Sequence, residues 1–278
     1  MRNLTQDNIT QAVIARFADT PDPRLKEIVT SLVQHLHAFA REVKLTEAEW
    51  FQGIDFLTRT GQMCDDKRQE FILLSDVLGL SMLTVAMNND KPAGCTEATV
   101  FGPFYVEGAP EYDCGEDVAN GAIGEPCEVR GHVRGIDGKP VPGAVLEVWQ
   151  ADAEGSYDVQ RPGLSEAQGR GVLRAQTDGS FHFRTIVAEA YPIPTDGPVG
   201  ELLDATKRHP WRPAHLHFKI SAPGFETLIT HVFRDGDRWL DSDAVFGVRQ
   251  SLVAPWQKLP GGDYLLDYDF VLNPLRPR

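Results

Sequence analysis

Residues 127–138 read Cys-Glu-Val-Arg-Gly-His-Val-Arg-Gly-Ile-Asp-Gly, and this stretch indicates the fold most clearly. Apolar or small residues alternate with polar ones through most of Cys127 to Ile136. A period of two is typical of a β-strand with one face in a core. Asp137-Gly138 then supplies the residue pair that a tight hairpin turn prefers.

The same alternation continues toward the C-terminus. Further strands are expected over residues 144–151, 181–187, 214–221, 227–233 and 265–272. Thr177-Asp178-Gly179 marks another turn, and most of the 19 prolines and 25 glycines fall between these runs. Short strands separated by Gly/Pro turns predict a mainly β protein with a β-sandwich catalytic domain over residues 96–278.

The part before residue 95 has a helical period instead. One apolar stripe with spacings of three and four consists of Leu25, Ile28, Leu32, Leu36, Phe39 and Val43. Thr46 and Glu49 form a capping-box pattern before the next helix. Residues 71–87 predict one buried helix, and 5–17 a shorter one. Residues 1–95 are therefore expected to be an α-helical N-terminal domain that serves packing or dimerisation.

Composition limits the classes of function. The chain has 278 residues, 42% hydrophobic, and a formal net charge of −13. It is too apolar for a disordered protein, and its negative charge disfavours nucleic acid as a partner. The N-terminus has no apolar signal-peptide core, and no run approaches a membrane span. Four cysteines without a C-x-x-C pair are read as free thiols of a cytoplasmic protein.

The chemistry concentrates in Trp211-Arg-Pro-Ala-His-Leu-His-Phe218. Because side chains alternate along a strand, His215 and His217 point the same way, and Leu216 and Phe218 point into a core. Two imidazoles on one face can bind a metal, although such a pair also occurs for structural reasons. A zinc site would need a third ligand, and a ferrous site a carboxylate.

Two tyrosines lie in loops outside these strands. Tyr157 follows the strand 144–151, and Tyr191 is followed by Pro192-Ile-Pro194, which stiffens its loop. Two phenolates with two imidazoles form a hard, anionic ligand set that suits Fe(III) better than Fe(II). Periodicity alone does not select these residues, because single tyrosines in loops are ordinarily packing residues.

Together these segments resemble the intradiol ring-cleavage dioxygenases, the non-haem Fe(III) family that opens catechols between their hydroxyls. The matching pieces are Phe101-Gly-Pro-Phe-Tyr105, the run from Gly131 to Tyr157, Tyr191-Pro-Ile-Pro194 and Arg212-Pro-Ala-His-Leu-His-Phe218. The helical part fits the catechol-type branch, so the resemblance covers nearly the whole chain. It implies one Fe(III) per subunit, held by Tyr157, Tyr191, His215 and His217.

Within the family the chain looks closest to the hydroxyquinol 1,2-dioxygenases. Asp76 is the reason: the resemblance places it above the iron, where a carboxylate would accept a hydrogen bond from the third hydroxyl of benzene-1,2,4-triol. As an alternative, Asp76 is an ordinary surface charge and the substrate is a catechol or chlorocatechol. The other expected substrate contacts are Leu73, Val100, Phe101, Gly102, Phe104, Ile193, Pro194, Arg212, His231 and Val245. His231 departs from the Gln that catechol-type relatives carry, and we interpret it as lying behind the iron ligands.

The resemblance also implies the reaction. Tyr191 would take a substrate proton, and Arg212 would stabilise negative charge on the ring carbon; alternatively Arg212 forms a surface ion pair. Cleavage of hydroxyquinol with O2 would give 3-hydroxy-cis,cis-muconate, which tautomerises to maleylacetate. Relatives form homodimers through the N-terminal helices, some with phospholipid between the subunits.

Two functions from other classes stay open at this point. The stretch Gly131–Val145 with Thr177–Phe181 also resembles non-catalytic prealbumin-like binding modules. Three histidines, His215, His217 and His231, would alternatively serve a zinc hydrolase. Iron content and oxygen consumption separate both from a dioxygenase.

Overall fold

The computed structural model describes residues 2–65 and 68–275. The chain divides into two compact units, residues 1–59 and 60–278. The helices that follow residue 60 belong to the same compact unit as the β-strands, whereas the sequence had grouped them with the N-terminal helices.

The first unit is helical. It contains α1 (Ile9–Ile14), the 3-10 helix η1 (Ala15–Phe17), α2 (Pro23–Glu42) and most of α3 (Glu47–Gln62). The Asp22 carboxylate caps α2 by accepting hydrogen bonds from the amides of Arg24 (2.8 Å) and Leu25 (3.2 Å). The predicted capping box is present: the Glu49 carboxylate accepts from the Thr46 amide at 2.9 Å, and the Thr46 hydroxyl accepts from the Glu49 amide at 3.3 Å.

The apolar stripe of α2 is present but uncovered. Its six side chains, from Leu25 to Val43, are each about half exposed, between 48% and 54%. Trp50, Phe51, Ile54 and Leu57 of α3 are exposed as well. Contiguous apolar surface of this kind on a polar chain marks an interaction face.

The second unit begins with two helices where the sequence predicted one. α4 (Glu70–Val77) and α5 (Leu80–Asn88) meet at a bend of 78°. Gly79 lies between them with φ of +74°, a left-handed conformation that ends a helix and that glycine adopts without strain. The expected burial holds only for one side, which includes Leu73, Val77 and Met82. The opposite side is exposed.

No single helix in the described part of the chain is long and apolar enough to cross a membrane. The bent pair of α4 and α5 meets the length and composition test only when the two helices are counted together.

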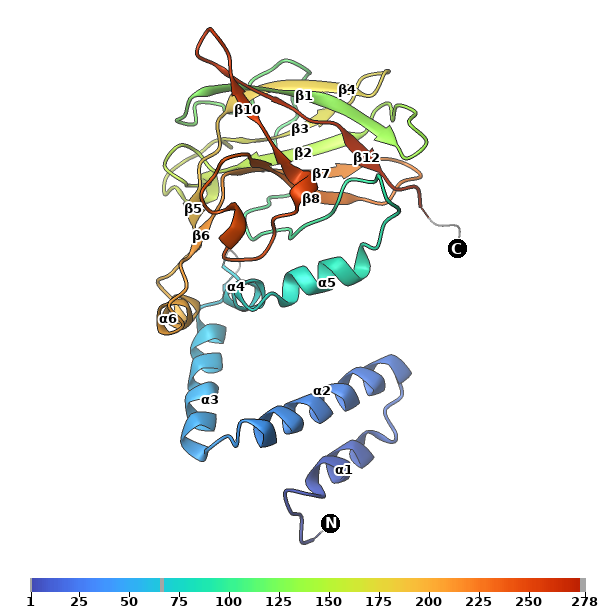
Figure 1. The fold of residues 1–278 in the computed structure, drawn as a ribbon, viewed down its shortest axis with the longest axis vertical. Helices are drawn as coiled ribbons and strands as arrows, with labels where there is room; N and C mark the ends of the chain where they lie inside the picture. The colour runs from blue at the N-terminus through green and yellow to red at the C-terminus, as the bar shows by residue number, and fades with distance from the viewer. Residues whose placement is uncertain (1, 66–67, 276–278) are drawn as a thin grey trace. The chain divides into compact units, whose positions relative to one another are not determined.

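Two five-stranded sheets form the body of this unit (Figure 1). In the first, β10 (Trp256–Lys258), β11 (Tyr264–Asp267), β1 (Pro126–Gly135) and β4 (Ser180–Ile186) lie side by side, and β12 (Phe270–Leu272) continues the edge of β11 along β1. The second has the order β3 (Arg170–Arg174), β2 (Val145–Gln150), β7 (His215–Ser221), β8 (Leu228–Arg234), β9 (Val253–Ala254).

The two sheets enclose the core, which confirms the β-sandwich. The Phe218 ring of β7 lies 4.6 Å from Phe270 and 6.5 Å from Phe181, both of the facing sheet. The prediction that Leu216 and Phe218 point inward is confirmed, because both are fully buried in this core. The opposite face of β7 is therefore free for the histidines.

The predicted strands match the observed ones to within a residue or two, with three differences. The expected strand 265–272 is two strands, because the chain leaves the ladder between Asp267 and Phe270. β3 and the short C-terminal strands were not predicted. A short hairpin of β5 (Tyr191–Pro192) and β6 (Trp211–Arg212), the helix α6 (Pro198–Ala205) and 3-10 turns η2 (Asp158–Gln160), η3 (Leu240–Ser242) and η4 (Gln250–Leu252) complete the unit.

Candidate metal centre and active site

A row of three aromatic side chains crosses the outer face of the second sheet. In the strand register, Trp149 of β2 lies opposite His217 of β7, which lies opposite His231 of β8. His215 lies two residues earlier on β7 and therefore shares this face. All four side chains are buried, so other parts of the chain cover this side of the sheet.

The imidazole of His215 has a fixed orientation. Its Nδ1 lies 2.6 Å from the carbonyl oxygen of Pro213. A carbonyl only accepts hydrogen bonds, so Nδ1 carries the proton and Nε2 keeps a free lone pair. Hydrogen bonds of this type orient metal-binding histidines.

The imidazole of His217 points into the same space. Its Nε2 lies 3.1 Å from Nε2 of His215 and 2.9 Å from the phenol oxygen of Tyr157. Its Nδ1 is buried and has no hydrogen-bond partner among the described residues. The Nε2 atoms of His215 and His217 and the phenol oxygen of Tyr157 thus converge on one small space.

Tyr157 is held there by the turn that follows β2. Its amide donates to the side chain of Gln160 at 2.9 Å, and its ring stacks on Phe104 with centroids 4.3 Å apart. The next residue, Asp158, forms a buried ion pair with Arg170, and Arg170 also donates to the Phe104 carbonyl at 3.0 Å. The sequence did not single out this ion pair.

Tyr191 reaches the site from the β5–β6 hairpin, where it pairs with Arg212. The Nη1 of Arg212 lies 3.3 Å from the Tyr191 phenol oxygen and 3.3 Å from Nε2 of His215. The rings of Tyr157 and Tyr191 are 5.3 Å apart, edge to face. The structure therefore brings together all four predicted metal-binding side chains and Arg212.

Asp243 holds the charge of Arg212 in place. Its carboxylate accepts from Nε of Arg212 at 3.1 Å and from Nη2 at 3.3 Å, and both side chains are 2% exposed. Arg212 thus belongs to a buried ion pair with Asp243. The alternative that Arg212 forms an ion pair on the surface is wrong. Asp243 follows Arg212 by 31 residues with no recognisable spacing, so the sequence offered no signal for it.

The protonation states suit metal binding. Burial is the main cause that lowers the pKa of His215 well below its usual value, and the charge of Arg212 is the second. Burial is also the main cause that lowers the pKa of His217, and the neighbouring His215 is the second. Both rings are therefore neutral with available lone pairs. Burial, and then the neighbouring Tyr191, raises the pKa of the Tyr157 phenol well above its usual value. The Tyr157 phenol thus loses its proton only when a strongly charged cation binds to its oxygen.

A cavity adjoins these groups. Of the eleven predicted substrate contacts, nine line it, together with Pro103 and Tyr191. The nine are Leu73, Asp76, Val100, Gly102, Phe104, Ile193, Pro194, Arg212 and Val245. The residues come from α4, the segment after α5, the β5–β6 hairpin and the loop before η4, so no local sequence pattern unites them.

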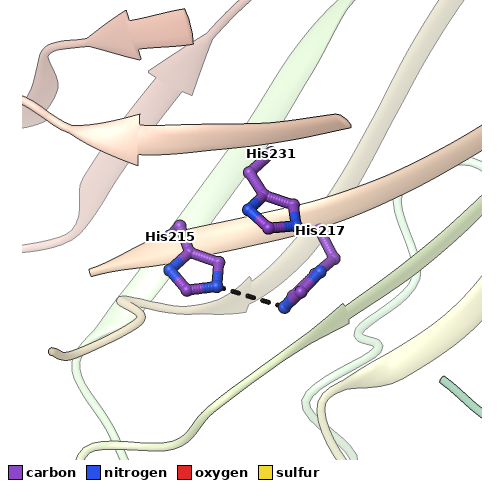
Figure 2. Close-up of side chains that lie close together, drawn as sticks. All are labelled: His215, His217 and His231. Atoms are coloured by element: carbon purple, nitrogen blue, oxygen red, sulfur yellow. Dashed lines mark hydrogen bonds between the residues drawn. The ribbon is translucent and has the colours of Figure 1, made fainter. Parts of the chain in front are cut away.

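Two of the predicted contacts lie elsewhere. Phe101 packs against Tyr105 with centroids 4.7 Å apart and against Trp149 at 5.7 Å. His231 lies next to His215 and His217, as Figure 2 shows, and its ligand atoms lie within 4.8 Å of theirs. Its ring is nearly parallel to His215, with an interplanar angle of 13°.

Asp76 is a buried carboxylate on the cavity wall, 4% exposed. The surface-charge alternative for it is therefore wrong. Burial raises its pKa, and Ser81 and Arg212 partly oppose that change. A buried carboxylate facing a cavity favours a ligand that can donate a hydrogen bond.

The arrangement of these side chains defines a metal centre beside a ligand cavity. Two neutral imidazoles and two phenols converge in a buried site, and an arginine and a cavity wall of mainly apolar groups lie beside them. Such a donor set fits a metal ion, and a cavity adjoins it.

The comparisons with known proteins agree. The family described as "Dioxygenase" matches residues 100–274, and "Catechol dioxygenase N terminus" matches residues 22–96. A 6-chlorohydroxyquinol 1,2-dioxygenase of Cupriavidus pinatubonensis is 74% identical over 274 residues, 99% of each chain. A hydroxyquinol 1,2-dioxygenase of Nocardioides simplex is 53% identical, over 92% of this chain and 87% of that one. The crystal structure of hydroxyquinol 1,2-dioxygenase from Pseudomonas putida superposes with a TM-score of 0.91 at 48% identity, covering 97% and 99% of the two chains.

The chain belongs to the intradiol ring-cleavage dioxygenases. It is therefore an enzyme, an oxidoreductase of that family, with a metal site at the histidine cluster. This membership decides against the non-catalytic binding module and the zinc hydrolase that the sequence left open.

Proposed function

We propose that this chain cleaves the ring of hydroxyquinol, benzene-1,2,4-triol, with O2 between the adjacent hydroxyls to give 3-hydroxy-cis,cis-muconate and hence maleylacetate. The observation that carries the proposal is the buried carboxylate of Asp76 in the same cavity wall as Arg212 and Tyr191. The relatives named for hydroxyquinol and 6-chlorohydroxyquinol support it.

The metal in this proposal is Fe(III), one per subunit, held by Tyr157, Tyr191, His215 and His217. The ligand set supports iron because two phenols that become phenolates form a hard, negatively charged pair, which a trivalent ion stabilises. When bound, the ion acts as a Lewis acid that lowers the pKa of the substrate hydroxyls and prepares the ring for O2.

The side chains of the cavity perform the remaining work. Tyr191 lies where its phenol oxygen can exchange a proton with a substrate hydroxyl, and the Arg212 guanidinium at 3.3 Å stabilises the anionic form of that oxygen. The same positive charge stabilises negative charge that develops on the substrate. Ile193 and Pro194 line the wall on the hairpin side and help to exclude water.

Asp76 supplies the selectivity. The third hydroxyl of hydroxyquinol donates a hydrogen bond to its carboxylate, whereas catechol has no donor to offer there. An unpaired buried acceptor costs about 1–3 kcal/mol, which corresponds to roughly 5- to 150-fold in the ratio of specificity constants.

In our proposal residues 1–95 form the dimerisation domain, in which Leu73 and Asp76 also reach the cavity, and residues 96–278 the catalytic domain. A homodimer would cover the exposed apolar stripe of α2, and a phospholipid chain is a further occupant of that surface. The free cysteines, Cys64, Cys95, Cys114 and Cys127, support a reducing, cytoplasmic location.

Oxygen uptake of the purified protein tests the proposal, with hydroxyquinol, 6-chlorohydroxyquinol, catechol and 4-chlorocatechol measured side by side. We expect the highest kcat/KM with a hydroxyquinol. Asp76→Leu should reduce the preference for hydroxyquinol over catechol by roughly 5- to 150-fold. Asp55→Leu, at an exposed carboxylate of α3, is the control and should leave the ratio unchanged. A preference that stays the same in Asp76→Leu contradicts the assignment of the substrate.

Iron is tested separately by metal analysis and visible absorption. Phenolate-to-Fe(III) charge transfer should colour the protein. Tyr157→Phe and His217→Ala should lose iron or activity, since each removes one ligand. A colourless, iron-replete protein, or full iron content in both variants, would exclude this ligand set.

A further inference from the structure

The two metal-binding histidines of the proposed site are held in different ways. His215 donates its Nδ1 proton to the Pro213 carbonyl at 2.6 Å, which fixes both its ring plane and its tautomer. His217 has no such bond, because its Nδ1 is buried without a partner among the described residues. Some other contact must keep its Nε2 directed at Tyr157.

Ring contacts surround His217 on two sides. The indole of Trp149 stacks on it with centroids 4.6 Å apart and an interplanar angle of 16°. The His231 ring meets it edge to face at 4.0 Å and 67°. Because all three residues are direct cross-strand neighbours, the sheet itself fixes the spacing of the rings.

The Trp149 side has its own anchor. The Tyr105 ring contacts the indole at 5.3 Å, edge to face. The Tyr105 hydroxyl donates to Glu147 at 2.5 Å and accepts from Lys219 at 2.8 Å. Glu147 and Lys219 are also cross-strand partners. Each lies two residues from Trp149 or His217 along its strand, so both pairs are on the same face of the sheet. The anchor and the histidine are thus built on the same two strands.

The His231 side has only weak polar contact. Both ring nitrogens are buried without a hydrogen bond of good geometry among the described residues, and the Val100 backbone contributes a weak hydrogen-bond interaction to the ring. A buried polar group without a partner is unfavourable, so its presence needs an explanation. Its ring lies against both His215, at 4.6 Å, and His217, which indicates a role as a flat spacer between the strands and the two imidazoles.

We infer that Trp149 and His231 form a two-sided ring clamp that orients His217, and that Tyr105 anchors its Trp149 side. The three are positioning residues: they act through His217 and touch neither substrate nor O2. This inference rests on the proposed function, in which His217 binds the metal. It predicts that weakening the clamp loosens metal binding while the sandwich stays folded.

Two mild substitutions test the clamp, each with a matched control. His231→Gln removes one ring, and His132→Gln makes the same change at a half-exposed histidine of β1. Tyr105→Phe removes only the hydroxyl that bonds Glu147 and Lys219, and Tyr268→Phe removes a hydroxyl that bonds the Ser251 carbonyl elsewhere. The readout is the rate of iron loss to a chelator. We expect His231→Gln to increase the rate of iron loss roughly 10- to 100-fold, because substitutions of residues that orient metal-binding histidines commonly weaken metal binding by this factor. Tyr105→Phe should act in the same direction by a smaller factor, and both controls should match the wild type.

A second readout needs no metal. In the iron-free, 15N-histidine-labelled protein at pH 8, the ring nitrogens of His217 should give one sharp set of NMR signals, assigned by their absence from His217→Asn. His231→Gln and Tyr105→Phe should broaden or double that set, whereas the controls should not. Unchanged signals together with unchanged iron loss would overturn the clamp. If the wild type binds no iron, the proposed function fails, and the NMR signals alone still decide the clamp.

Discussion

Replacing Asp243 by Asn tests the view that the site depends on a buried ion pair. The carboxylate accepts two hydrogen bonds from Arg212, at 3.1 and 3.3 Å, and further ones from the amides of Val245 (3.3 Å) and Gly247 (2.9 Å). Four N–H groups thus converge on two oxygens. An amide keeps one oxygen and turns an NH2 group toward donors, and the guanidinium is left as an uncompensated buried charge.

The size of the effect follows from this burial. Removing one partner of a buried ion pair costs about 3–5 kcal/mol. For a unit of this size each kcal/mol shifts the melting temperature by about 2–4 °C, so Asp243→Asn should melt roughly 6–20 °C below the wild type. The melting temperature is measured by circular dichroism during a thermal scan. This measurement needs neither substrate nor metal.

The control removes a charge from a surface pair. Arg24 and Glu27 are 2.7 Å apart, but their side chains are 72% and 68% exposed. Exposed pairs contribute less than about 1 kcal/mol, so Glu27→Gln should shift the melting temperature little. If Asp243→Asn and Glu27→Gln melt alike, then Asp243 does not hold the Arg212 charge in the way described.

Three further predictions concern the fold. Gly131→Ala should destabilise the sandwich by several kcal/mol or prevent folding, because a Cβ there would lie 1.8 Å from the Tyr268 carbonyl oxygen; Gly53→Ala, in an open helical position, should be neutral or stabilise by about 1 kcal/mol, and urea unfolding compares the two. Burial raises the pKa of Cys127 from 9.0 to about 12, so the folded state keeps a proton that the unfolded chain loses as the pH rises past 9. The stability from this thiol is therefore complete below pH 9 and is lost between pH 9 and 12. Iodoacetamide at pH 8 should leave Cys127 unlabelled in the native protein and label it in guanidinium; labelling at the same rate in both states would contradict this. Asp22→Ala should destabilise the first unit by about 1 kcal/mol through loss of the α2 cap, and equal unfolding midpoints for variant and wild type would refute that.

The fold could be predicted where local periodicity reports burial directly. The strands around Cys127 and His215 alternate because one face lies in the sandwich core, and that pattern is visible in the sequence. The break between α4 and α5 was missed because Gly79 lies within a continuous apolar run, where a glycine is compatible with a helix. β3 was missed because its short run, with arginine at both ends, gives little alternation.

The candidate site could be predicted only in part for a different reason. His215 and His217 share a strand, so their common face follows from a period of two. Tyr157 and Tyr191 lie on separate loops, and only the resemblance to a family joined them to the histidines. Asp243 could not be found from the sequence, because it acts through a contact between segments that are distant along the chain.

The charges around the cavity explain why one acidic residue can decide the substrate. The charge of Arg212 is already balanced by Asp243, and the two imidazoles are neutral because burial lowers their pKa. Among the residues that line the described cavity, Asp76 is the acidic one. Asp243, which pairs with Arg212, is not part of this lining. A ligand that offers a donor there adds a hydrogen bond to the Asp76 carboxylate, and a ligand without one leaves it buried with only its contact to Ser81, which disfavours binding. Selectivity in this pocket thus arises as much from the unfavourable state of Asp76 with a plain catechol as from its hydrogen bond to a triol.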